Sequence, residues 1–199
     1  MHQRKSKKIL FYFFLIIVIS SVNNLSLHNL KFNNINDIKI YGLSKKENNI
    51  LLQEIKKMNL ENIFFINSNE ISNLMNSNTL IEHYEIKKRY PSTIYVKIQK
   101  TNFYAKINID DKTFLIGSNG KLSPNHFQNN DLPFIFGKPN IKEFLYFKKI
   151  IDQSKFSYDQ IENLYFYPSK RWDLKLKNNI LLKLSEKPTI EYLDDIYQF

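Results

Sequence analysis

The feature that most constrains this chain is an uninterrupted apolar run close to its N-terminus. Eleven apolar residues extend from Ile9 to Ile19 (ILFYFFLIIVI), directly after a basic stretch. Ser20, Ser21 and Val22 lengthen the run to fourteen residues, about 21 Å of helix against a hydrocarbon core of roughly 30 Å. A helix without a polar face does not suit the surface of a soluble domain, so the run predicts a membrane-directed segment.

Two interpretations of this segment remain open. A transmembrane anchor over residues 9–27 needs flanking lysines that reach the interface, or continuation of the helix through Asn23–Leu27. A cleaved secretory signal has the same layout, although no Ala-x-Ala cleavage site follows the run. We expect an uncleaved anchor. In both cases the basic residues favour a cytoplasmic tail over residues 1–8 and an exported body.

Composition narrows the function classes. Hydrophobic residues make up 43% of the 199 residues, enough to build a core, and the absence of cysteine excludes disulfides and thiolate metal sites. Arg4, Lys5, Lys7 and Lys8 contribute four of the formal net charge of +10. We expect no nucleic-acid partner, because the chain has neither an arginine cluster nor an RNA-binding aromatic motif.

Periodicity predicts two folded regions of an α+β protein after the irregular residues 23–34. In the first, a strand–helix–helix–strand–strand order is expected, with Ser44 and Glu47 as a capping box at the start of the first helix. Its elements are expected at Ile35–Tyr41, residues 44–58, 67–76, Ile81–Tyr90 and Thr93–Lys100.

The second region is expected to be a mainly antiparallel β domain with helices. Asn178-Asn179 is expected to form a two-residue hairpin turn, and residues 121–133 a surface loop. The final helix is expected to carry Ile190, Leu193 and Tyr197 as its apolar stripe. Strands are expected at Ala105–Ile109, Thr113–Ile116, Ile161–Tyr167, Trp172–Lys177 and Ile180–Leu184, and helices at Pro139–Gln153 and Pro188–Phe199.

No constellation of residues indicates catalysis. The four histidines are scattered without metal-ligand spacing, and the pairs Asp110-Asp111 and Asp194-Asp195 are typical of solvated turns and ends. Residues 117–120 (GSNG) are too short for a phosphate loop and favour a hairpin turn. We therefore expect no catalytic, metal or cofactor site, no small-molecule substrate and no enzyme.

The strand Ile81–Tyr90 has the charge pattern of an exposed sheet edge. Such an edge can pair with an extended partner, or its charges can simply prevent aggregation; the sequence leaves both open.

The order of elements resembles a POTRA domain, and further motifs follow it. The segment IEHYEIKKRYPSTIYVKIQKTNFYAKI resembles two strands that meet at an aromatic-Pro turn. Downstream, FLIGSNGKL resembles a hairpin in which Gly117 replaces the usual Asp, LPFIFGK a Leu-Pro-x-hydrophobic-x-Gly step, and WDLKLKNNILLKL a Trp-bearing hairpin. Together with the N-terminal segment, this ordered set resembles the FtsQ/DivIB family of bacterial cell-division proteins.

The resemblance implies a tail (1–8), an anchor (9–27), a POTRA-like domain (35–101) and an FtsQ-type β domain (102–199). It implies a non-enzymatic, single-pass inner-membrane scaffold at the division septum, with its body in the periplasm. This scaffold would link early division proteins to later septal machinery through FtsB/FtsL-type partners. Because the second POTRA strand is implicated in recruitment in this family, the resemblance carries partner binding to His83, Ile86 and Lys88.

Three departures from the family pattern accompany this expectation: a short tail, the missing hairpin Asp, and a chain that stops at Phe199, where relatives add a strand. We therefore expect that the chain is truncated or that its FtsB contact lies elsewhere. The alternative function is a POTRA-containing periplasmic accessory of outer-membrane protein assembly or secretion, with a cleaved signal peptide.

Overall fold

The computed structural model describes residues 3–22, 35, 37–58, 60, 68–124 and 131–197. Its contacts divide the chain into two compact units, one comprising Met1–Ile71 and Glu85–Lys97 and the other Ser72–Tyr84 and Ile98–Phe199.

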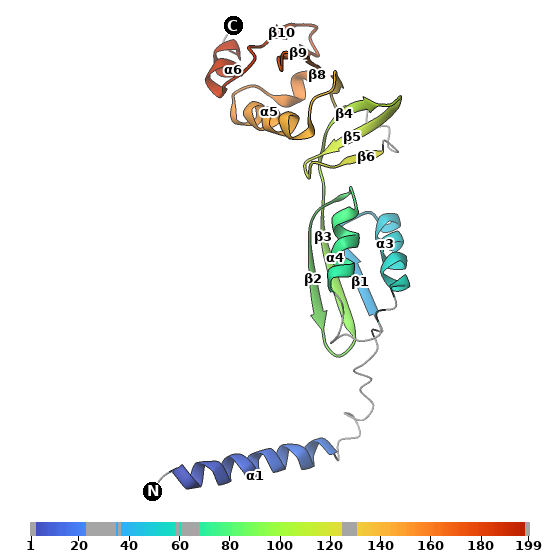
Figure 1. The fold of residues 1–199 in the computed structure, drawn as a ribbon, viewed down its shortest axis with the longest axis vertical. Helices are drawn as coiled ribbons and strands as arrows, with labels where there is room; N and C mark the ends of the chain where they lie inside the picture. Colours follow the sequence, from blue (N-terminus) through green and yellow to red (C-terminus); the bar gives the residue numbers. More distant parts are fainter. Residues whose placement is uncertain are drawn as a thin grey trace. The chain divides into compact units, whose positions relative to one another are not determined.

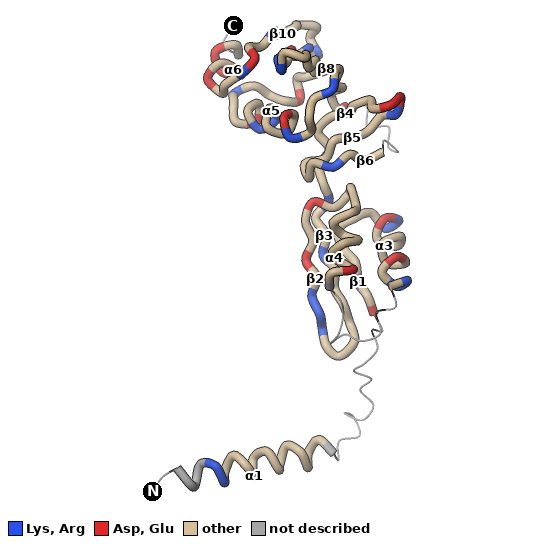
Figure 2. The backbone as a smooth tube through the Cα atoms, in the orientation of Figure 1, with Lys and Arg blue, Asp and Glu red and all other residues tan. Residues whose placement is uncertain are grey.

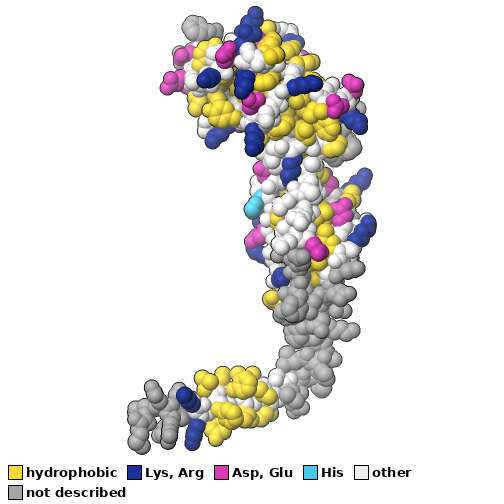
Figure 3. All heavy atoms as spheres, viewed as in Figure 1, with side chains coloured by type: hydrophobic (Ala, Val, Ile, Leu, Met, Phe, Trp, Pro, Cys, Tyr) yellow, Lys and Arg dark blue, Asp and Glu magenta, His cyan; other side chains and the backbone are white. Residues whose placement is uncertain are grey.

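The first helix, α1 (Gln3–Val22), contains the apolar run and begins closer to the N-terminus than the expected residue 9. Its apolar side chains from Ile9 to Ile19 are all exposed, and Figure 3 shows hydrophobic side chains along the visible face of the helix. Figure 2 shows the basic residues at the start of the helix and none along the rest of it. Within the described residues, no helix combines the length and the apolarity needed to cross a membrane. Residues 23–27 of the expected anchor lie outside the described residues.

A three-stranded sheet with two helices follows, in the order predicted for a POTRA-like domain (Figure 1). β1 pairs in parallel with the central strand β3, and β2 forms the other edge. Asn67, the expected start of the second helix, lies outside the described residues. The elements are β1 (Asp37–Tyr41), α3 (Lys45–Lys57), α4 (Ser68–Ser77), β2 (Ile81–Arg89) and β3 (Thr93–Lys100).

The helix α3 begins at the predicted capping box. The Ser44 backbone N–H donates to the Glu47 carboxylate at 2.9 Å, and the Glu47 N–H donates to the Ser44 hydroxyl at 3.3 Å. Leu51 and Ile55 of this helix are buried, as are Ile94 and Val96 of β3. Burial of one face of the helix and one face of the strand gives this unit its core.

The second unit contains a seven-stranded sheet in the order β10-β9-β8-β7-β4-β5-β6. The pairs β4–β7 and β7–β8 are parallel and the other four are antiparallel, so the predicted mainly antiparallel domain is confirmed. Its elements are β4 (Phe103–Ile109), β5 (Lys112–Gly117), β6 (Leu122–Pro124), β7 (Phe134–Phe136), α5 (Ile141–Gln153), η1 (Tyr158–Gln160), β8 (Ile161–Phe166), β9 (Trp172–Leu176), β10 (Leu181–Lys183) and α6 (Ile190–Tyr197).

Two sequence expectations for this unit were wrong. The expected loop over residues 121–133 contains β6, whose three residues are too few to produce a readable alternation; residues 125–130 lie outside the described residues. The β9–β10 hairpin has a three-residue loop: the Leu176 N–H donates to the Ile180 carbonyl at 2.9 Å, and Asn179 adopts a φ of 69°. A left-handed residue at the third loop position matches the twist of the strands, and asparagine tolerates that conformation.

The hairpin between β4 and β5 turns at Asp110-Asp111, as the turn interpretation predicted. Both residues have positive φ, 49° and 60°, the geometry of a two-residue type I′ turn. The acidic pair is therefore explained by local backbone geometry.

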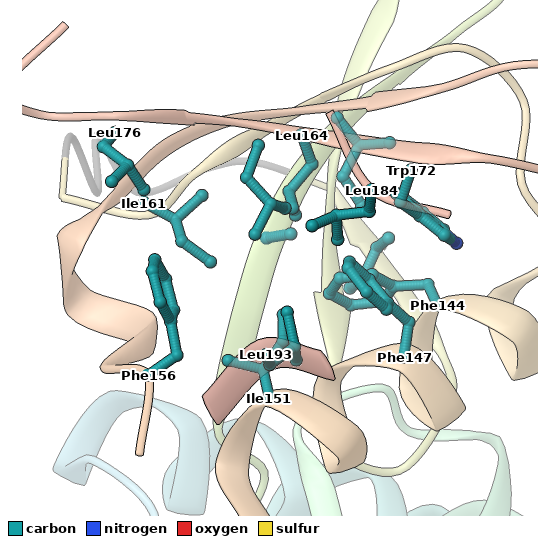
Figure 4. Close-up of a cluster of buried hydrophobic side chains, with 14 of the residues drawn as sticks. Phe144, Phe147, Ile151, Phe156, Ile161, Leu164, Trp172, Leu176, Leu184 and Leu193 are labelled. Atoms are coloured by element: carbon teal, nitrogen blue, oxygen red, sulfur yellow. The ribbon is translucent and has the colours of Figure 1, made fainter. Parts of the chain in front are cut away.

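The core of the second unit lies between the sheet and the helices α5 and α6 (Figure 4). The single tryptophan, Trp172, is 4% exposed and stacks on Phe147, with ring centroids 4.8 Å apart and an interplanar angle of 11°. Phe166 meets the same indole at 4.8 Å. Leu193 of α6 is fully buried in this core, whereas Ile190, expected on the same stripe, is 37% exposed. The side chain of Tyr197 lies outside the described residues.

Replacement of Phe147 by alanine should destabilise the second unit by about 3–5 kcal/mol, because it removes a buried ring and leaves Trp172 without the ring on which it stacks. The neighbouring Tyr146→Ala is a matched control, since Tyr146 is 68% exposed on the same helix, and should change the unfolding free energy by about 0.5 kcal/mol or less. Urea unfolding followed by Trp172 fluorescence measures both. Equal losses in the two variants would contradict the assigned core.

Candidate partner-binding surfaces

The three residues expected to bind a partner all lie on β2, an edge strand of the three-stranded sheet. His83 and Lys88 are exposed and Ile86 is half-buried. Because side chains alternate along a strand, Ile86 and Lys88 share one face and His83 lies on the other. A partner that contacts all three would therefore have to reach both faces along the edge.

The face of this sheet that points away from its buried core carries stacked aromatic and basic side chains. Tyr41 stacks on Tyr95 with ring centroids 6.5 Å apart, and the Lys39 ammonium lies 5.7 Å from the Tyr95 ring centre. The nearby Asp37 carboxylate, 3.3 Å from that ammonium, raises the pKa of Lys39. These side chains are exposed or half-buried and offer a polar, aromatic surface to a partner.

Within the second unit, the GSNG turn is the centre of a hydrogen-bond cluster. The Asn119 amide donates to the carbonyls of Thr79 and Ile81, at 3.0 and 2.9 Å. Lys121 donates through its ammonium to two further carbonyls, those of Asn76 and Asn78. The turn therefore satisfies backbone carbonyls from the end of α4 to the start of β2.

Hydroxyl groups complete this turn cluster around one carboxylate. Glu82 accepts from the Ser118 hydroxyl at 2.5 Å and from the Thr101 hydroxyl at 2.9 Å. The cluster leaves little space at Gly117, the position at which the resemblance implied an Asp. A Cβ at Gly117 would lie 2.6 Å from the Asn119 side-chain oxygen and 3.0 Å from the Thr101 hydroxyl, so a larger residue would displace both.

Asn119→Ala should lower the free energy of unfolding by about 1–3 kcal/mol, because two part-buried carbonyls lose their donor. Asn102→Ala is a suitable control, since Asn102 is exposed and contributes its backbone groups to the same turn. Thermal unfolding of both variants tests the assignment. An Asn119→Ala protein as stable as the control would show that water replaces the amide without loss.

An aromatic row lies on the face of the seven-stranded sheet that points away from the α5 core. The rings of Phe134 and Phe136 are 4.9 Å apart, and Tyr165 stacks on Phe136 at 5.0 Å. Phe136 is 45% exposed beside a hollow of about 400 Å³. Exposed aromatic rings of this kind are common anchors of protein interfaces. The alternation of these rings with buried Ile135 could have predicted the strand, although its shortness hid the pattern.

Gly137 ends the aromatic strand at the position expected from the Leu-Pro-x-hydrophobic-x-Gly step. Its φ is +102°, and a Cβ there would lie 2.3 Å from the Phe166 carbonyl oxygen. Only glycine combines this conformation with such a close approach.

A polar cavity of about 430 Å³ lies elsewhere in the second unit and is lined in part by Lys148, Asp152 and Tyr158. The buried Lys148 ammonium is paired with Asp152 at 2.5 Å and lies 4.1 Å from the Tyr158 ring centre and 4.6 Å from that of Tyr104. The Tyr158 hydroxyl donates to the Tyr104 carbonyl at 2.9 Å. Burial, and secondarily the Asp152 charge, raises the pKa of Tyr158 far above the ordinary value for tyrosine.

Lys148, Asp152 and Tyr158 of this cavity all have partners within the protein. Lys148 is paired with a carboxylate and enclosed by two rings, so its charge has partners within the fold. Within the described residues, no group of three or more His, Asp or Glu side chains could hold a metal ion. Asp194, one of the acidic pair near the end, accepts from the Lys155 backbone N–H at 2.6 Å and is thus part of the fold.

The sequence of this chain is similar to those of known proteins. Residues 33–100 match the FtsQ-type POTRA domain. The cell division protein FtsQ of Rickettsia typhi (strain ATCC VR-144 / Wilmington) is 26% identical over 169 residues, which cover 80% of this chain and 62% of that protein. FtsQ of Rickettsia bellii (strain RML369-C) is 27% identical over 169 residues, 80% of this chain and 61% of that protein. The chain thus spans about three fifths of the length of these relatives.

A solved structure is also similar: the major extracytoplasmic domain of the trans isomer of the bacterial cell division protein DivIB from Geobacillus stearothermophilus. It matches with a TM-score of 0.35 and 11% identity, over 50% of this chain and 87% of that domain.

The alignments with FtsQ proteins extend well beyond the matched POTRA domain, since they cover 80% of the chain. The element order, the FtsQ-type POTRA match and these alignments agree with each other. Residues 33–100 are an FtsQ-type POTRA domain, and the chain is similar over most of its length to cell division proteins of the FtsQ type.

Proposed function

We propose that this chain is a non-enzymatic, single-pass membrane scaffold of the bacterial divisome. It links early and late division proteins at the septum through contacts of its extracytoplasmic domains. The single observation that carries this proposal is the FtsQ-type POTRA match at residues 33–100, within alignments to proteins named as cell division protein FtsQ.

The proposed topology follows from α1. Residues 1–8 form the cytoplasmic tail and residues 9–27 the inner-membrane anchor, with the POTRA-like domain (35–101) and the β domain (102–199) in the periplasm. Support comes from the apolar side chains that surround α1 and from the basic residues at its start. A bilayer would cover the apolar surface that water would otherwise contact.

The proposed partners are other divisome membrane proteins of the FtsB/FtsL type. Recruitment along β2 would use His83, Ile86 and Lys88, and the edge position of this strand is compatible with such a contact. We propose neither a nucleic-acid partner nor a small-molecule substrate. The alternative, an accessory of outer-membrane assembly with a cleaved signal, is not favoured by relatives that are division proteins.

A fluorescent fusion of the full chain should concentrate at the septum and restore division in cells depleted of their own FtsQ. Lys88→Glu should still reach the membrane but leave the cells filamentous, because it reverses a charge on the recruiting strand. Lys97→Glu, an equally exposed change on β3, should rescue division like the unmodified chain. Fluorescence microscopy and cell length measure these outcomes.

Uniform envelope fluorescence, together with normal division in depleted cells that lack the fusion, would contradict the division role. Equal rescue by the Lys88→Glu and Lys97→Glu proteins would contradict the recruiting role of β2 while leaving the division role intact.

A further inference from the structure

The end of the three-stranded sheet at which β1 begins carries a concentration of basic residues. β1 pairs in parallel with β3, with Asp37 opposite Thr93, so both strands begin at the same end. The Asp37 backbone N–H donates to the Ser92 carbonyl at 3.3 Å, which fixes the β2–β3 turn beside the start of β1. The last residues of β2 therefore lie at this end as well.

The helix α3 adds cations to the same end. It packs against β1 and runs back along it (Figure 1). Its thirteen residues rise about 20 Å and the five of β1 about 17 Å, so its last turn lies near the level at which β1 starts. Basic residues appear there and at the end of β2 in Figure 2. We define this basic end as Lys56, Lys57, Lys87, Lys88 and Arg89.

All five side chains of the basic end are exposed. Among the described acidic residues near this end, Glu85 lies 2.9 Å from Lys87, and Asp37 pairs with Lys39. Glu54 lies on α3 about one turn before Lys57. Arg89 donates to the Tyr95 hydroxyl at 3.3 Å, an exposed contact with a hydroxyl group and not with a carboxylate. The balance at this end is therefore positive.

Tyr90, next to these cations in the β2–β3 turn, is 55% exposed. Exposed tyrosine beside lysine and arginine is typical of protein surfaces at the headgroup level of a bilayer, because the ring is apolar and its hydroxyl is polar.

Chain length limits how far this end can be from α1. Fourteen residues separate Val22 from Asp37, which at full extension span about 50 Å. Opposite charges interact weakly beyond about 8 Å at physiological salt, so the basic end would have to lie close to the headgroups in order to bind them. A segment of this length permits such contact with a bilayer that holds α1.

We propose that the basic end of the first unit binds the anionic headgroups of the membrane in which the chain is anchored. The inference rests on the membrane attachment proposed above. Phosphatidylglycerol offers a negative phosphate to which lysine and arginine are attracted, and each cation near such a surface strengthens the contact roughly fivefold. The contact would draw the β2–β3 turn to the bilayer.

The absence of native cysteine allows a single fluorophore to be placed at Ser92→Cys in the full chain. The labelled protein is reconstituted into vesicles of phosphatidylcholine, with or without phosphatidylglycerol, that contain headgroup spin-labelled lipid as a quencher. We expect quenching in the anionic vesicles. This quenching should be lost at roughly 1 M salt, where the Debye screening length falls to about 3 Å. In the zwitterionic vesicles, Ser92 should remain unquenched.

A variant of the basic end, here named the tip variant, removes four of its five charges: Lys56→Gln, Lys57→Gln, Lys87→Gln and Arg89→Gln. It retains Lys88, so that the proposed recruiting residues are unchanged, and should show no quenching in anionic vesicles. The matched control removes four exposed charges of the second unit (Lys149→Gln, Lys155→Gln, Lys177→Gln and Lys183→Gln) and should be quenched like the parent. Thermal unfolding checks that both variants fold, and the salt series on the parent chain tests the contact without any substitution.

Equal quenching with and without phosphatidylglycerol, or full quenching of a folded tip variant, would overturn the lipid contact. Flotation of the vesicles tests the anchor separately. A chain that fails to float with phosphatidylcholine contradicts the anchor. If it then floats with anionic vesicles and the tip variant does not, the lipid contact stands; if it floats with neither, both proposals fall.

Discussion

Parallel pairing of β1 with β3 is the constraint on which the three-stranded sheet and its helices depend. A parallel neighbour cannot be reached through a hairpin, so α3 and α4 must cross over between the two strands. The same pairing brings the entry of the chain, the β2–β3 turn and the end of α3 to one end of the sheet. It also leaves β2 at the edge, where a partner strand has access. The proposed lipid contact and the proposed recruiting strand are both consequences of this one arrangement.

Local patterns predicted much of the fold. The reciprocal hydrogen bonds of Ser44 and Glu47 formed as expected, and Trp172, Leu174 and Leu176 are all buried on one face of β9 as their alternation indicated. These signals survive because they depend on residues two or three positions apart, a separation at which backbone geometry determines contact directly.

Features that depend on distant residues could not be read in this way. β7 is only three residues long and is held by parallel neighbours on both sides, so neither its length nor a turn marks it in the sequence. The role of Asn119 depends on carbonyls about forty positions earlier in the chain. The turn around Gly117 was predicted correctly, yet the small space around that glycine depends on Thr101 and Asn119 and could not be read from the turn itself. The candidate residues lie on β2, an edge strand of the three-stranded sheet, but their role in recruitment still rests on family resemblance.

The proposed membrane scaffold requires that the apolar helix remain attached to the body that follows it. Mass spectrometry of the mature protein, purified from its own cell envelope, tests this most directly. An anchored scaffold predicts an N-terminus that still contains residues 1–22. A new N-terminus near Ser21 would contradict the anchor and, with it, the account of a membrane-tethered division protein.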